Sequence, residues 1–159
     1  MRPSVLAVLL VLGSLSACGG GGGAVETPSP IASPLTSGRA EVRVTGDVRD
    51  RFQVPLDAEA TTIYQPPAGG FAVTWGQEGH GLGVGGLLFT GTRSTDQALS
   101  VTVTALRDGA PVVLASFDGE CEVTIDRADG TGIEGSFRCV ALSVRDLFAD
   151  ARGTFSASA

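Results

Sequence analysis

Lysine is absent from this chain, and the positive charge that remains is small. All eleven basic residues are arginines, against 17 aspartates and glutamates, so the formal net charge is −6 over 159 residues. A nucleic-acid-binding protein needs a basic patch or stripe, and this acidic composition argues against that function. The same composition argues against adhesion to anionic lipid through charge alone.

Histidine occurs once, as His80, and this scarcity limits the chemistry of the chain. A hydrolytic triad would use His80 as its base beside a serine or cysteine nucleophile, but no G-x-S-x-G elbow occurs. A zinc site needs three or four His or Cys ligands, which are not present once the cysteines are assigned below. We therefore interpret His80 as a surface or loop residue, and we expect no catalytic activity, no metal and no cofactor.

No apolar run is long enough for a comfortable membrane span, which needs about 20 residues. The longest, Val5–Leu12, follows Arg2 and precedes the small residues Gly13 and Ser14. A short positive segment, an apolar stretch and small residues are the three parts of a secretory signal peptide.

The end of this segment carries a resemblance to a known class of proteins. Leu15-Ser16-Ala17-Cys18 resembles the bacterial lipobox, which is a leucine, two small residues and a cysteine. The resemblance implies that Cys18 is the lipidation site, with cleavage before it and acyl chains such as palmitate on the new first residue. Two or more chains anchor a protein stably where one does not. The implied location is an exported protein, lipid-anchored to the bacterial cell membrane or outer membrane; the alternative is an ordinary secretory signal with a chance cysteine.

Composition divides the remainder into a spacer and one domain. Five glycines at 19–23 precede a stretch rich in proline, serine and threonine, which cannot bury enough apolar surface to order itself. We predict a signal peptide at 1–17, a lipidated cysteine and Gly/Pro/Ser spacer at 18–38, and a β domain at 39–159. The spacer would have a root-mean-square reach of roughly 25 Å.

The hydrophobic pattern of the domain has a period of two residues, as in Leu99–Thr104, with turn signals at regular intervals. It predicts an all-β fold: a single antiparallel β-sandwich or barrel-like domain of nine or ten short strands. One segment differs, because Ser143–Ala151 has a capping-box start and apolar residues at helical spacing. There we expect a turn or two of helix at most, or an ordered loop.

Cys121 and Cys139 lie symmetrically about Gly130, inside a turn signal. Pairing the flanking strands across that centre places the two cysteines opposite each other, and Val123 opposite Phe137 on the same face. A slip of one residue would put charges in the core, so this register is well specified. We predict a cross-strand disulfide, which suits an exported protein. The alternatives are two buried free thiols, or a redox pair, which would need a Cys-x-x-Cys spacing that is absent.

Glycines at 81, 83 and 86 match the string G-x-G-x-x-G, but no helical pattern follows, so we expect no nucleotide. Instead, glycine at every second position from Gly79 to Gly85 predicts a strand with one bare face. We expect Trp75 or Phe89 to pack on that face. The alternative is a flat groove for a ligand or partner.

Acidic residues gather near the predicted hairpin. Asp126, Asp129 and Glu134 surround its turn, where calcium is an alternative to plain turn chemistry. Glu120 and Glu122 lie two apart, as paired catalytic carboxylates sometimes do, but a solvated strand face explains them sufficiently.

The domain also has a loose likeness to small envelope lipoproteins of high-GC bacteria, through Gly135-Ser136-Phe137 with Cys139 and through Gly153-Thr154-Phe155. We do not recognise a domain family from it. We expect a membrane-anchored, non-catalytic binding or structural module whose partner is an envelope protein or the cell wall. The alternative is a carrier of a lipid or small hydrophobic ligand, which would need an apolar cavity.

Overall fold

A computed structural model describes residues 35–61, 63–116 and 118–159 of the chain. The predicted signal peptide, Cys18 and most of the predicted spacer lie outside these residues. The described chain folds into eleven strands that form two antiparallel sheets, which confirms the predicted all-β class. No helix in this part of the chain has the length and apolar character needed to cross a membrane.

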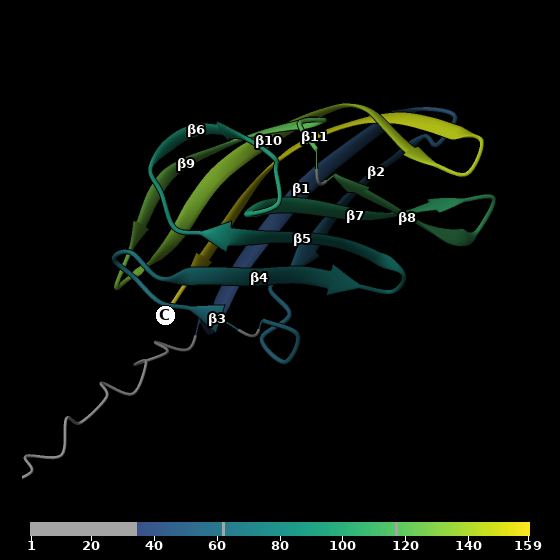
Figure 1. The fold of residues 1–159 in the computed structure, drawn as a ribbon. Coiled ribbons are helices and arrows are strands. Elements are labelled where there is room, and N and C mark those ends of the chain that lie inside the picture. The colour runs from purple at the N-terminus through teal and green to yellow at the C-terminus, as the bar shows by residue number, and fades with distance from the viewer. Residues whose placement is uncertain (1–34, 62, 117) are drawn as a thin grey trace, which may run out of the picture.

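The two sheets have six and five strands (Figure 1). The larger has the order β2-β1-β11-β10-β9-β6, and the smaller β3-β4-β5-β7-β8. The strands of the larger sheet are β1 (Ser37–Gly46), β2 (Asp50–Pro55), β6 (Gly91–Ser94), β9 (Cys121–Asp129), β10 (Gly132–Val144) and β11 (Leu147–Ser158). Those of the smaller sheet are β3 (Ile63–Tyr64), β4 (Gly70–Gln77), β5 (His80–Leu87), β7 (Leu99–Arg107) and β8 (Ala110–Ser116).

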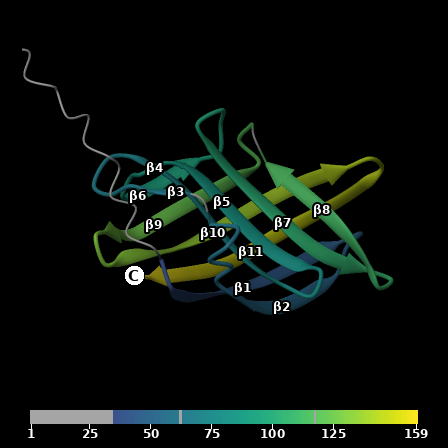
Figure 2. The ribbon, with the colours of Figure 1, turned by 90° about the horizontal axis from the view of Figure 1, so that it is seen from below.

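The sheets pack face to face, and their strands cross rather than run alongside each other (Figure 2). In the longer strands, such as β1, β4, β7 and β9, alternate residues point into the space between the sheets, as the period of two predicts. Trp75 is completely buried there, with its ring 5.2 Å from that of Phe155 and its indole N–H donated to the Ser156 carbonyl at 2.9 Å. The hydroxyl of buried Tyr64 likewise donates across the sheets, to the Asp129 carbonyl at 2.6 Å. Burial raises the pKa of Tyr64, so the hydroxyl keeps its proton.

The folded domain begins earlier than its predicted start at residue 39. β1 starts at Ser37, Thr36 donates its N–H to the Ser158 carbonyl at 2.7 Å, and Leu35 is buried in the core. Residues 37 and 38 therefore belong to the sheet, and Leu35 and Thr36 pack or bond against the folded domain just before it. Composition misses this boundary because one leucine among small polar residues gives no periodic signal.

The predicted hairpin of β9 and β10 is confirmed, with its disulfide. Cys121 pairs with Cys139 and Val123 with Phe137, and the two cysteine Cα atoms are 3.9 Å apart. Val140 donates its N–H to the Glu120 carbonyl next to this pair, so the cysteines occupy the narrow, non-hydrogen-bonded position. A bulge before the turn, between the pairings of Glu134 and Gly135, is an addition that the symmetrical pairing did not predict.

The two Gly-x-Phe triplets fit each other across β10 and β11. Gly135 pairs with Phe155, and Phe137 pairs with Gly153, so each ring lies over the glycine of the opposite strand. A Cβ at Gly153 would lie 2.8 Å from the Phe137 ring and 2.1 Å from the Glu41 carbonyl oxygen. Only glycine lets the three strands approach this closely.

The expected helical turn in Ser143–Ala151 is wrong. Val144 pairs with Leu147 across a two-residue hairpin loop, whose first residue, Arg145, has a φ of 53°. Buried Ala149 and Ala151 follow the period of two, while Phe148, which precedes Ala149, is exposed. The helical spacing therefore does not produce a shared face, because pairing with the neighbouring strand determines the local structure. The short strand β6 is a further element that the sequence did not predict.

Removal of the disulfide should destabilise the domain without changing its fold. The loop between the cysteines spans 18 positions, for which chain entropy predicts a loss of about 3 kcal/mol in the free energy of unfolding. Urea denaturation of the Cys121→Ala/Cys139→Ala variant measures it. An unchanged midpoint, or no gain of two hydrogens in mass on reduction of the wild type, would contradict the bridge.

Gly153→Ala should destabilise the domain by about 1–3 kcal/mol, because its methyl group would overlap the Glu41 carbonyl. Gly130→Ala is the matched control, since a Cβ there meets nothing within 4 Å. Thermal and urea denaturation of both variants give the comparison. Equal stability of the two variants would show that the close approach at Gly153 is not a constraint.

Candidate functional site

Four arginines form a row across the outer face of the six-stranded sheet. Arg43 on β1 pairs with Arg51 on β2 and with Arg152 on β11, which in turn pairs with Arg138 on β10. Side chains that are directly opposite lie about 5 Å apart at Cβ. The row therefore places four positive charges along a line of three strand spacings, about 14 Å. We call Arg51, Arg43, Arg152 and Arg138 the arginine row.

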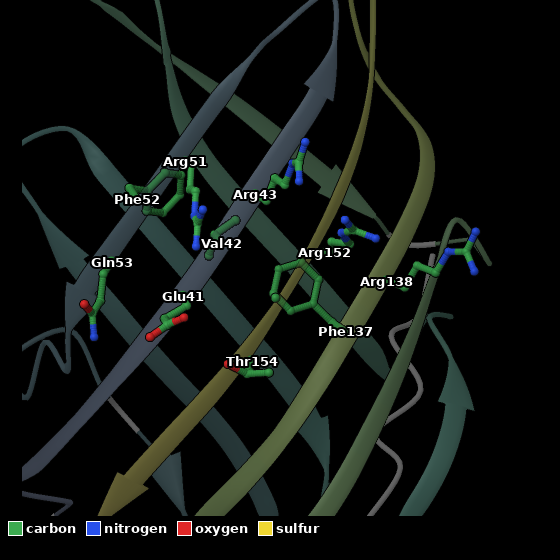
Figure 3. A pocket seen from close by; sticks show the side chains of 11 residues that line it. Glu41, Val42, Arg43, Arg51, Phe52, Gln53, Phe137, Arg138, Arg152 and Thr154 are labelled. Atoms are coloured by element: carbon green, nitrogen blue, oxygen red, sulfur yellow. The ribbon is translucent and has the colours of Figure 1, made fainter.

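All four side chains of the arginine row are exposed (Figure 3). In the part of the chain that the structure describes, none of the four forms an ion pair or a side-chain hydrogen bond; the arginines that do are Arg49, Arg107 and Arg127. Like charges directly opposite on a sheet destabilise it. The fold thus holds four guanidinium groups side by side with no ion pair to any of them among the described residues.

A shallow hollow of about 720 Å³ lies along the arginine row (Figure 3). It is open to solvent, and its charged lining consists of the four arginines and a single glutamate, Glu41. A second, smaller hollow on the other side of the row shares three of the arginines and includes Asp150. The remaining residues around the larger hollow are Val42, Phe52, Gln53, Phe137, Gly153 and Thr154.

Carboxylates limit the width of the positive surface. Glu41 lies one outward position from Arg43 along β1, and Asp150 one outward position from Arg152 along β11. Glu122 pairs with Arg138 and ends the row at β9. Asp150 also accepts the N–H of Ala141 at 2.9 Å. The positive surface is therefore a stripe one residue wide, with an acidic residue on each side.

His80 lies where the two sheets meet. It opens β5, is partly buried, and places Nε2 3.1 Å from the Asp50 Oδ2 atom. Its ring lies 4.6 Å from that of Phe52, and the same Asp50 oxygen accepts the Leu106 N–H at 2.8 Å. These contacts tie β2 of one sheet to β5 and β7 of the other. No serine or cysteine contact to His80 is recorded among the described residues.

The bare glycine face exists, but the prediction that Trp75 or Phe89 covers it is wrong. Leu82 and Val84 of β5 point into the core, where Trp75 also lies, so the glycines between them face outward. The nearest atoms to a Cβ at Gly83 belong to Thr102, on the neighbouring strand of the same sheet. The cross-strand neighbours of these glycines are Ala72, Thr74, Ser100 and Thr102, so this surface carries small, uncharged side chains. The alternative, a flat groove for a ligand or partner, stays a prediction.

The carboxylates of the hairpin do not gather into a metal site. Thr131 donates its N–H at 2.8 Å and its O–H at 2.6 Å to Asp129 Oδ1. These hydrogen bonds hold the pKa of Asp129 below its usual value and fix the turn. No group of three or more potential metal ligands occurs in residues 35–61, 63–116 and 118–159.

Glu120 and Glu122 have separate roles. The Ser116 hydroxyl donates to Glu120 Oε2 at 2.7 Å, and Asp118 donates its N–H to the same oxygen at 3.0 Å. Glu122 is exposed on β9 at the end of the arginine row. Glu120 thus fixes the turn before β9, whereas Glu122 lies on the outer face of the sheet.

Comparison with known proteins adds no assignment: a scan against family models, a search of curated proteins and a search of solved structures each find no match. The surfaces described here are therefore interpreted from their own chemistry.

Arg152→Gln should raise the free energy of unfolding by about 0.2–1 kcal/mol, because it removes one charge from between two like charges. The gain should shrink at high salt, which screens the repulsion. Arg39→Gln is the matched control, since its cross-strand neighbours, Pro55 and Ser156, are uncharged. Urea denaturation at low and high salt measures both. A loss of stability specific to Arg152→Gln would mean that this arginine supports the fold.

Proposed function

We propose that the protein is an exported, lipid-anchored module that binds a partner through its outer surface and has no catalytic activity of its own. Cys18 would carry the lipid, and the segment before Leu35 would act as the spacer. The observation that carries the proposal is the contrast between a filled interior and an open surface.

Large side chains fill the space between the sheets. Trp75, Leu114 and Ile125 are at most 1% exposed and belong to one continuous core cluster with Phe71 and Phe155. The hollow along the arginine row lies on the outside of the six-stranded sheet and not between the sheets. A carrier of a hydrophobic ligand needs an apolar cavity, so this arrangement supports surface binding over the carrier alternative.

The position of the first strand fits a tethered module. β1 begins at Ser37, next to Ser158 near the C-terminus, so the spacer joins the domain at one end of the larger sheet (Figure 1). Arg43 lies six residues further along β1, about 20 Å from that end. The arginine row would thus stand away from the attachment point.

Native mass spectrometry of the full-length protein, extracted from bacterial membranes in neutral detergent, tests the proposal. We expect the mass of residues 18–159 plus acyl groups, and no other bound species. The Cys18→Ala variant, as control, should carry no acyl mass.

Two results would contradict the proposal. A wild-type protein without acyl groups would remove the anchor. A small molecule that leaves only on denaturation would favour the carrier.

A further inference from the structure

We propose that the arginine row binds a single extended anionic polymer that carries a phosphate or carboxylate group in each repeat. This inference rests on the proposed function, because it names the partner of the surface-binding module. It assigns a binding site to Arg51, Arg43, Arg152 and Arg138 together.

The chemistry of the arginine row indicates which charged group a ligand would carry. A guanidinium is planar and presents its donors in a fork that matches the oxygens of phosphate and carboxylate. All four groups are exposed and without a recorded ion pair among the described residues, so their donors face solvent and not a protein acceptor. The neighbouring outward position on β11, Thr154, adds a hydroxyl at the edge of the same hollow.

The length of the arginine row fits a polymer better than a small ion. Four arginines on four adjacent strands span about 14 Å, whereas one phosphate group can engage only one or two of them. The hollow is open to solvent and follows the row across the strands. A chain with charges at intervals can contact all four arginines at once, and its contacts then add as linked binding events.

The narrow width of the arginine row fits a thin polymer chain better than a flat anionic membrane. Glu41 and Asp150 flank the arginines on opposite sides, so an anionic membrane lying flat on this face would meet carboxylates as well as guanidinium groups. A single polymer lying across the strands would contact the four arginines in sequence, with Glu41 only at the edge of the hollow and Glu122 beyond the end of the row. The acidic net charge of −6 likewise opposes approach to an extended anionic surface.

The strand register gives an independent argument that the arginine row binds an anionic ligand. The pairing places Arg43 and Arg152 each between two other arginines, a destabilising arrangement, and neither forms an ion pair among the described residues. A bound polyanion would remove this repulsion. Ligand binding and sheet stability should therefore be coupled in this molecule.

The experiment uses the lipidated full-length protein in neutral nanodiscs, with binding measured by calorimetry. The probes are short-chain polyphosphate, oligogalacturonate and inorganic monophosphate; the first two distinguish phosphate from carboxylate polymers. We expect one or both polymers to bind, monophosphate to bind far more weakly, and the affinity to fall steeply with salt. The Arg43→Gln/Arg152→Gln variant should bind the polymer about tenfold more weakly or worse, while its melting temperature stays the same or rises.

The matched control, Arg39→Gln/Arg107→Gln, removes the same charge from outside the row and should bind as the wild type does. Equal weakening in both variants would reduce the effect to overall charge and overturn the proposal. Binding of neither polymer, or of monophosphate as tightly as polymer, would overturn it too. Loss of polymer binding when the nanodiscs contain anionic lipid would show that the row docks on the membrane instead.

The outcomes separate this inference from the function on which it rests. A protein that carries acyl groups and no internal ligand, yet ignores both polymers, would keep the surface-binding module and lose only the polymer. A protein without acyl groups that still binds polymer through the row would keep the site and lose the anchor.

Discussion

The register of β10 against β11 is the constraint on which the rest of this structure depends. Phe137 over Gly153 and Phe155 over Gly135 allow only one alignment of the two strands at this close approach. The Cys121–Cys139 disulfide extends the same alignment to β9. A shift of one residue would turn the outward arginines into the core and the core residues out to solvent.

That register explains why a repulsive arrangement persists. The aromatic and disulfide contacts that align the strands also bring Arg138 opposite Arg152, and pairing with β1 then adds Arg43. Functional sites are where proteins break local rules at a cost to stability, and a like-charge ladder breaks the rule for cross-strand pairs. The filled core leaves the outer faces as the surfaces on which a partner can bind, and the larger sheet has a charged hollow on its face.

Local patterns made part of this structure predictable from the sequence. The alternation of polar and apolar residues gave the all-β class, and symmetry about Gly130 gave the disulfide hairpin, because both signals depend on neighbours in the chain. The position of the glycine face was not predictable, since alternation shows which residues share a face of β5 but not which face is inside. Helical spacing misled at Ser143–Ala151, where pairing between strands overrides local preference.

The arginine row lay beyond sequence reasoning for a different reason. Arg43 and Arg51 are separated from Arg138 and Arg152 by more than 80 residues, and only the insertion of β11 between β1 and β10 brings them into line. The net charge of −6 conceals such a stripe, because composition sums charges that the fold separates. The arginine row could have been predicted from the sequence only if the order of the strands in the sheet had been known.

Nuclear magnetic resonance of the arginine side-chain Nε–H groups, during a titration with a short anionic polymer, tests the central claim most directly. The account predicts that the signals of Arg43, Arg51, Arg138 and Arg152 shift together and saturate at one polymer per protein, while that of Arg39 stays in place. Shifts spread evenly over all the arginines, or absent from the row, would contradict it.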